Sequence, residues 1–260
     1  MKAFFTTLLA IICVAVLILG NIHWNKRTSV QAGDEIEERD NEPTTNIEEK
    51  ETKTEEDIAK ILELAGNWPE DTKVAFQAAL SEGQPFHILF VGSKAIEAGS
   101  NPWPQQLQLL MEEAYGESVF TFETITTDLI SDEYVAQELY KQWNSEADLI
   151  VFEPFTLNDN GEVVIEQSHA NILTMIAEID ATVILQPPHP LYNTKFYPIQ
   201  VSSLEKFATD NGIPYLNHWT AWPDPTTVEI QSYLDEEGSL PNDKGQEVWA
   251  NFLADYFINN

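Results

Sequence analysis

The 260-residue chain has few basic side chains and a single cysteine. Only 13 Lys and Arg residues stand against 43 Asp and Glu residues, which gives a formal net charge of -30 at pH 7. Nucleic-acid binding needs a Lys/Arg surface that neutralises phosphates, so the composition excludes nucleic acid as a partner. The same charge disfavours binding to anionic lipid headgroups. Because Cys13 is the only cysteine, no intramolecular disulfide can form, and the folded part must be stable through its core.

The sequence also lacks the motifs of common cofactor and metal sites. It contains no P-loop, no dinucleotide-binding glycine pattern and no Cys/His spacing typical of zinc. Asn158–Gly161 resembles the first half of a calcium loop, but Gln167 stands where such a loop needs a bidentate glutamate. We interpret this segment as a turn, and expect neither a metal nor a cofactor.

One long apolar run, Ala3–Gly20, stands at the amino terminus. Its about 18 residues nearly span a hydrocarbon core. The run is longer than the apolar part of a usual signal peptide, and no cleavage motif follows directly. Both features favour an uncleaved anchor, comprising residues 1–27, rather than a cleaved signal peptide. Lys26 and Arg27 follow the run and oppose an amino-terminus-inside orientation, whereas amino-terminal apolar segments of this kind drive export. We therefore expect a single-pass protein of the cell membrane with its carboxy-terminal domain outside the cytoplasm.

Residues 28–57 are acidic and almost free of large apolar side chains. Such a segment cannot bury enough apolar surface to offset its ordering entropy, so we expect a solvated tether. Glu55–Leu64 has apolar residues at helical spacing, and is either the first packed helix or the end of the tether. The domain itself is predicted over residues 58–260.

Short apolar strands alternate with amphipathic helices along the rest of the chain. Strands are predicted over residues 87–91, 118–124, 148–152, 182–186 and 214–216. Helices are predicted over residues 69–81, 104–115, 132–143, 167–179, 198–211, 227–234 and 242–257. This alternation predicts an α/β fold, a flavodoxin-like doubly wound sheet of five parallel strands with helices on both faces. Function in such a sheet lies at the carboxyl ends of the strands.

Three segments at or near these ends carry a family resemblance. Gly92-Ser93-Lys94 follows the first predicted strand, Leu157-Asn158-Asp159 follows the third, and Glu237–Gly245 precedes the last helix. In this order they resemble the Gly-Asp-Ser, Gly-x-Asn-Asp and Asp-Gly-x-His-Pro-Asn-x-x-Gly blocks of the SGNH/GDSL hydrolases. The resemblance covers about residues 87–257, and implies a flavodoxin-like fold and ester hydrolysis through a serine.

The first block fits the resemblance in two registers. Aligned without a gap, Ser93 stands at the family's aspartate and Lys94 at its nucleophile. With a one-residue deletion, Ser93 becomes the nucleophile and Lys94 follows it. The first register is simpler and leaves no nucleophile.

The resemblance implies an oxyanion hole made by Asn158. Its side-chain amide would donate a hydrogen bond to the developing charge, and one such donor contributes roughly 3 kcal/mol. The family also has a glycine after the second strand, but Glu123–Asp128 contains none.

The last block lacks the family's general base. Leu240 stands at the histidine and Glu237 at the aspartate of the triad. A leucine cannot accept a proton, so another histidine would have to act. His189 and His218 both follow predicted strands and are the candidates, although a histidine in such a place is more often a hydrogen-bonded structural residue or a substrate contact.

Three further residues are candidates for substrate binding. Lys94 is either an anion contact at a helix start or simply solvated, and Asp159 adjoins the predicted oxyanion donor. Trp219 is either a carbohydrate-stacking surface or part of a core plug, and the tendency of Trp to bury its area favours the plug.

Two functions follow from this pattern. The first is an extracytoplasmic esterase or deacylase that acts on an ester-bearing envelope glycan or lipid, with Ser93, Asn158 and His189 or His218 as its catalytic set. The second is an inactive module that keeps the fold and binds a cell-surface glycan or a partner protein. The Gly-Ser turn and the Asn-Asp loop support the first, and we class the chain with the hydrolases. The lysine, the leucine and the missing glycine support the second as the alternative.

Overall fold

The computed structural model describes residues 54–144 and 147–259. The predicted anchor and nearly all of the predicted tether lie outside these residues. Within them, no helix is long and apolar enough to cross a bilayer.

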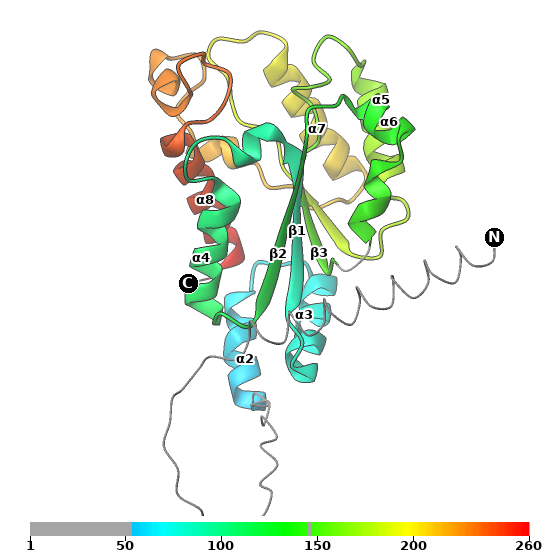
Figure 1. Ribbon diagram of the computed structural model, residues 1–260, viewed down its shortest axis with the longest axis vertical. Coiled ribbons are helices and arrows are strands. Elements are labelled where there is room, and N and C mark those ends of the chain that lie inside the picture. Colours follow the sequence, from blue (N-terminus) through cyan, green and yellow to red (C-terminus); the bar gives the residue numbers. More distant parts are fainter. Residues whose placement is uncertain (1–53, 145–146, 260) are drawn as a thin grey trace, which may run out of the picture. The chain divides into compact units, whose positions relative to one another are not determined.

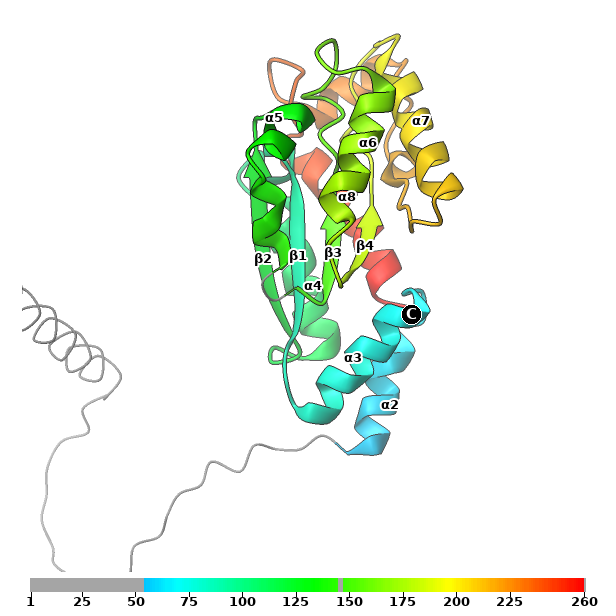
Figure 2. The ribbon, with the colours of Figure 1, turned by 90° about the vertical axis from the view of Figure 1, so that its right-hand side faces the viewer.

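The core of the domain is a four-stranded parallel sheet in the order β2-β1-β3-β4. The strands are β1 (Phe86–Ser93), β2 (Phe120–Thr127), β3 (Leu149–Phe152) and β4 (Thr182–Leu185). All residues of β3 are buried, as expected for a strand covered on both faces. Figure 2 shows the four strands side by side.

The predicted fifth strand is not formed. Around Pro214–Leu216 the chain makes only an isolated parallel bridge between Leu185 and Tyr215. Proline has no N–H to donate to a ladder, and the 3-10 helix η3 (His218–Ala221) begins two residues after Leu216. The sheet therefore has four strands, arranged in the order expected for the first four strands of a flavodoxin-like fold.

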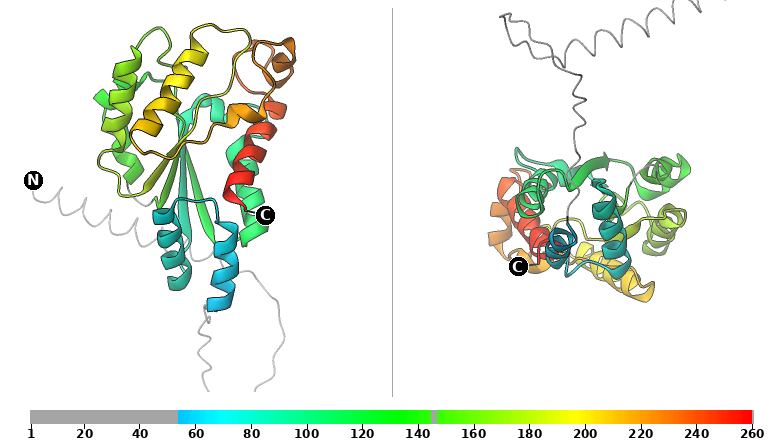
Figure 3. Two further views of the ribbon diagram at one scale, coloured as in Figure 1. Left: turned by 180° about the vertical axis from the view of Figure 1, so that it is seen from behind. Right: turned by 90° about the horizontal axis from the view of Figure 1, so that it is seen from below.

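Helices cover both faces of the sheet. Their bounds are α2 (Glu55–Leu64), α3 (Glu70–Glu82), α4 (Trp103–Tyr115), α5 (Ser131–Ala136), α6 (Ile165–Ile176), α7 (Tyr197–Asp210) and α8 (Asp243–Phe257). Seen from below in Figure 3, α4 and α8 lie on one side of the sheet and α5 and α6 on the other. Two buried apolar clusters correspond to these sides, one including Trp103 and Trp249, the other Phe152 and Phe155.

Two predicted helices are shorter or tighter than expected. The helix predicted over residues 132–143 is divided into α5 and the 3-10 helix η2 (Leu139–Asn144). Glu138 lies between them with a φ of 54°, a left-handed conformation that no α-helix contains. The helix predicted over residues 227–234 is the 3-10 helix η4 (Val228–Tyr233).

Helix α2 is a packed helix of the domain. Its Ile58 and Leu62 pack against the core cluster, and Thr54 closes its first turn with a capping box to Asp57. Helices α2 and α3 lie at the amino ends of the strands (Figure 1), and the loops that follow the strands lie at the opposite end. Since the helix begins at Glu55, it starts three residues before the expected domain boundary.

Candidate functional site

A pocket of about 460 Å³ opens at the carboxyl ends of the strands. Its walls come from the segments after β1, β2, β3 and β4, and from the loop before α8. The lining residues are Ser93, Lys94, Ala95, Asp128, Leu157, Asn158, His189, Leu191, Gly238, Ser239 and Leu240. Four of the residues predicted from the sequence, Ser93, Lys94, Asn158 and His189, are therefore brought together.

Ser93 ends β1 and points its polar groups into the protein. Its hydroxyl donates to the carboxyl group of Glu153, whose two oxygens lie 3.0 and 3.1 Å from Oγ. The Ser93 backbone N–H donates to the same carboxyl group at 3.1 Å. Oγ also caps the 3-10 helix η1 (Lys94–Glu97) by accepting the N–H of Ala95. Only 4% of Ser93 is exposed, so its hydroxyl is committed to internal contacts.

Glu153 is the site residue that the sequence reasoning missed. It follows β3 directly and is fully buried. Burial raises the pKa of its carboxyl group to about 8. The two hydrogen bonds from Ser93 act in the opposite direction and lower the pKa by less than burial raises it. The signal in the sequence was a glutamate directly after the apolar run Leu149–Phe152, where a charged side chain is brought to the edge of a buried sheet.

Gly92 makes room for this buried carboxyl group. A Cβ atom at this position would lie 2.6 Å from Oε2 of Glu153 and 3.0 Å from Cγ2 of Ile96. A glycine before Ser93 is therefore needed by the packing of Glu153.

We expect Gly92→Ala to lower the free energy of unfolding by about 1–3 kcal/mol, because the added methyl group overpacks this space. Urea unfolding followed by fluorescence measures the change. A loss below about 0.5 kcal/mol, the level of an ordinary surface substitution, would contradict the close contact with Glu153.

Lys94 is the residue of the first block that faces outward. Its side chain is 63% exposed and forms an ion pair with Asp128 after β2. An exposed pair of this kind contributes little to stability. It places one cation and one anion at the rim of the pocket.

The amide of Asn158 is engaged by the loop after β2. Its Nδ2 donates to the carbonyl oxygen of Leu129 at 2.9 Å and to that of Thr127 at 3.4 Å. Both N–H groups thus have backbone acceptors, and an oxyanion would have to compete with them.

The two candidate histidines differ in their surroundings. His189 lines the pocket, and its Nε2 lies 2.9 Å from the carbonyl oxygen of Ser239. His218 does not line it, and both of its ring nitrogens are taken, Nε2 by the carbonyl of Pro187 and Nδ1 by the indole N–H of Trp222. Among the described residues, neither histidine hydrogen-bonds to Ser93.

Both imidazoles are kept neutral. Burial lowers the pKa of His189 to about 4, against the hydrogen bond to Ser239 and the charge of Asp235, which raise it. Burial likewise lowers the pKa of His218 to about 3. The ring of His218 stacks on Trp249 at 4.2 Å between centroids, a contact that fits a structural residue.

The other predicted substrate contacts lie outside the pocket. Asp159 is buried, and its carboxylate accepts hydrogen bonds from the N–H and hydroxyl of Ser131 and from the hydroxyl of Ser168. Trp219 donates its indole N–H to the carbonyl of Pro188 and packs against Tyr197. These contacts give both residues a structural role.

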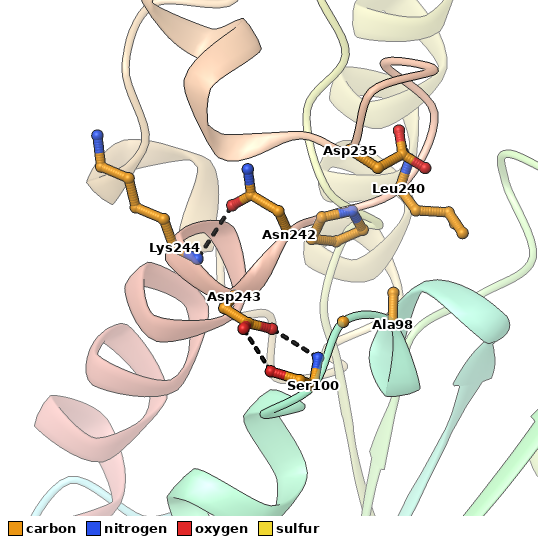
Figure 4. A pocket seen from close by; sticks show the side chains of 9 residues that line it. Ala98, Ser100, Asp235, Leu240, Asn242, Asp243 and Lys244 are labelled. Atoms are coloured by element: carbon orange, nitrogen blue, oxygen red, sulfur yellow. Dashed lines mark hydrogen bonds between the residues drawn. The ribbon is translucent and has the colours of Figure 1, made fainter.

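Leu240, which stands at the expected histidine position, separates the pocket from a second hollow of about 560 Å³. Figure 4 shows the second hollow, with Leu240 and Asp235 on one side and Ala98 opposite. The side chain of Asp235 holds the loop by accepting the backbone N–H groups of Ser239 and Leu240. On the lower side, Asp243 accepts hydrogen bonds from the N–H and hydroxyl of Ser100.

In residues 54–144 and 147–259, no group of three or more His, Cys, Asp or Glu side chains is positioned to hold an ion.

Solved hydrolases share this architecture. An α/β hydrolase from the metagenome of Lake Arreo, Spain, superposes with a TM-score of 0.55 at 12% identity, over 66% of this chain and 94% of its own. A protein of Parabacteroides merdae described as a GDSL-like lipase gives 0.53 at 10% identity, over 66% and 95%. The acetylxylan esterase Axe2 of Geobacillus stearothermophilus gives 0.52 at 11% identity, over 66% and 94%. No family model matches the sequence, and the comparison with curated proteins found no match. The resemblance predicted from the motifs is thus confirmed at the level of the fold.

Proposed function

We propose that this chain, whose domain has the fold of the GDSL hydrolases, is a non-hydrolytic module that binds a ligand in the pocket beside Ser93. One observation carries the proposal. The hydroxyl and the backbone N–H of Ser93 both donate to the buried carboxyl group of Glu153. A serine that serves as a nucleophile must present its oxygen to the substrate, whereas only 4% of Ser93 is exposed, and an oxyanion hole needs N–H groups free to donate.

The rest of the pocket supports the same function. The side chain that faces solvent after β1 is that of Lys94, which forms an ion pair with Asp128. Leu240 supplies no proton acceptor, and the amide of Asn158 is already bonded to Leu129. The parts that a serine hydrolase uses for its chemistry are thus replaced or occupied, while the hollow itself is kept.

The predicted setting suggests where the ligand is found. With an amino-terminal anchor and an exported domain, the pocket would meet the cell envelope. We therefore propose a cell-surface glycan as the ligand and the outer side of the cell membrane as the location.

The test compares ester hydrolysis by the full-length protein and its Ser93→Ala variant. We expect p-nitrophenyl acetate to be turned over at the same background rate by both, because no catalytic nucleophile is lost. Initial rates from absorbance at several enzyme concentrations measure this. A rate for the wild type that exceeds that of Ser93→Ala by a factor of 100 or more, as general base catalysis of about 10²–10⁴ would give, would overturn the proposal.

The contact between Ser93 and Glu153 also favours a second function, ester hydrolysis at alkaline pH. The Ser93 hydroxyl lies 3.0 Å from a carboxyl group whose pKa burial raises to about 8, which is close to the value that suits a general base. Ionised Glu153 would take the proton of Ser93 while Oγ attacks an ester carbonyl, and would return it to the alcohol as that leaves. Glu153 would then take a proton from the water that attacks the acyl-serine and return it to Oγ as the acid is released.

This esterase would gain activity as pH rises through about 8, because only ionised Glu153 can accept the proton. A rate that rises tenfold between pH 7 and 9, and disappears in both Ser93→Ala and Glu153→Gln, would establish it in place of the binding module.

A further inference from the structure

The two edges of the sheet differ in how the chain covers them. At β4, Leu185 donates its backbone N–H to Pro214 and accepts that of Leu216, so the segment after α7 closes this edge. At the other edge, β2 pairs with β1 alone, and Figure 2 shows it as the outermost strand. Among the residues that the structure describes, the outer edge of β2 is therefore open.

The free backbone groups of this edge belong to every second residue of β2. Phe86 of β1 donates its N–H to the carbonyl oxygen of Val119, while its register partner is Phe120. Because a residue in a parallel pair bonds to the two neighbours of its register partner, the odd-numbered residues of β2 bond to β1. Alternate residues of a strand direct their N–H and C=O groups to opposite sides. The residues whose groups point outward, and bond to no described residue, are Phe122, Thr124 and Thr126.

Strand β2 lacks the features that protect exposed sheet edges. Proteins blunt such edges with short strands, bulges, lysine or proline. This strand has 8 residues, against 4 in β3 and 4 in β4, and its register with β1 runs without a bulge. Its sequence, FTFETITT, has no lysine or proline and is rich in residues that favour strands. A further extended segment can therefore pair with it along its length.

The charges beside this edge are mostly negative. The side chain of Glu123, in the middle of β2, is 57% exposed. Exposed Glu117 precedes the strand, and exposed Glu97 accepts a hydrogen bond from a threonine near its carboxyl end. The cation at that end, Lys94, is already paired with Asp128. A partner with positive side chains complements this edge.

We propose that the open edge of β2 binds an extended, lysine- or arginine-bearing segment of another protein, which adds a strand to the sheet. Its backbone pairs with Phe122, Thr124 and Thr126, and its basic side chains lie beside Glu123. A second copy of this chain would bring like charges together at the edge, and residues 28–53 of the chain itself are also acidic. No residue of β2 lines the pocket, so this proposal does not depend on the proposed function.

The first experiment titrates the full-length protein with three synthetic octapeptides by calorimetry. The probe alternates lysine with valine and threonine, a second peptide has glutamate in place of lysine, and a third is the probe with every backbone nitrogen methylated. We expect the lysine peptide to bind and the other two to bind at least about tenfold more weakly. Equal binding of the lysine peptide and its methylated form would show attraction by charge alone. That result, or no binding of any peptide, would overturn the proposal.

Thr124→Pro tests the backbone pairing. The N–H of Thr124 points away from β1, so proline removes an outward donor and leaves the bonds to β1 intact. We expect thermal unfolding like that of the wild type and a loss of affinity for the lysine peptide of about tenfold or more. Thr124→Val keeps the N–H, is the matched control and should bind like the wild type. Unchanged binding in Thr124→Pro would contradict the proposed pairing.

Glu123→Lys tests the charge, and keeps the proposal testable if Thr124→Pro does not fold. The side chain is exposed, so the fold should be kept. We expect the lysine peptide to bind about fivefold more weakly or worse, and the glutamate peptide to bind more tightly. Glu229→Lys, at an exposed position on η4, changes the net charge equally and should bind like the wild type. Equal effects of both substitutions, or no effect of either, would mean that β2 is not the binding site.

Amide hydrogen exchange, resolved by residue with NMR, separates the proposed partner from other occupants. In the free protein we expect the amides of Phe122, Thr124 and Thr126 to exchange faster than those of their odd-numbered neighbours, and to be slowed by the lysine peptide. Protection that appears only as the protein concentration rises would overturn the proposal and assign the edge to a second copy. Protection at every concentration without peptide would assign it to another segment of this chain.

Discussion

Glu153→Gln is expected to stabilise the protein at pH 9 by about 4–5 kcal/mol, while leaving its stability at pH 4.5 nearly unchanged. The carboxyl group has a pKa of about 8 in the folded protein and an ordinary value of 4.5. Between these values the unfolded chain releases the proton and the folded chain keeps it. Stability therefore falls by about 1.4 kcal/mol for each pH unit in this interval.

The glutamine fits the existing contacts. Its carbonyl oxygen can accept the N–H of Ser93 in place of Oε2, and its amide can donate to the hydroxyl in place of Oε1, at positions that lie 3.1 and 3.0 Å away. The variant thus imitates the protonated acid at every pH.

Denaturant unfolding of wild type and Glu153→Gln between pH 4.5 and 9 measures the effect. The buried histidines lower stability in both proteins on the acid side, because they must become charged, so the difference between the two curves isolates Glu153. Glu162→Gln, an exposed glutamate after the same strand, is the matched control and should run parallel to the wild type. If the curve of stability against pH for Glu153→Gln also ran parallel to that of the wild type, the carboxyl group of Glu153 would have the same pKa in the folded and unfolded states.

Trp68→Ala is expected to lower the free energy of unfolding by about 3–5 kcal/mol, enough to remove a large part of the stability of a domain. Trp68 lies between α2 and α3 and is 3% exposed. Its ring stacks on Phe76 with the centroids 5.0 Å apart, and its indole N–H donates to the carbonyl oxygen of Phe257 at 2.9 Å. The substitution leaves a cavity and removes one of the two hydrogen bonds to the carbonyl group at the end of α8, the other being donated by the hydroxyl of Tyr115.

Thermal and urea unfolding of the full-length protein check this expectation. Val74→Ala on α3 is the control, because Val74 is 67% exposed and its loss should change stability by about 0.5 kcal/mol or less. A loss of stability in Trp68→Ala as small as that in Val74→Ala would contradict this expectation. It would mean that the packing of α2 and α3 through Trp68 adds little to the free energy of unfolding.

Much of the fold was readable from the chain because its signals are local. The apolar run that becomes β3 and the spacing of Leu107 and Met111 in α4 report burial directly. The fifth strand was wrongly predicted because an apolar triplet does not reveal whether it will find a partner. The break at Glu138 was missed because a left-handed residue other than glycine leaves no mark in composition.

The site was located by sequence more firmly than it was understood. Parallel strands bring their carboxyl ends to one edge, so Ser93, Lys94, Asn158 and His189 could be expected to meet there. Which way each side chain turns depends on neighbours that are distant in sequence. Ser93 turns inward because Glu153, sixty residues later, offers a buried carboxyl group.

By itself, then, the sequence determined the alternation of strands and helices, the edge at which a site would lie and the absence of the usual histidine, because each follows from local pattern. The tertiary structure alone decided the partner of Ser93, the surroundings of the two histidines and the hollow beside Leu240. These depend on packing between segments far apart in the chain, where burial and hydrogen bonding select one arrangement from the several that the sequence permits.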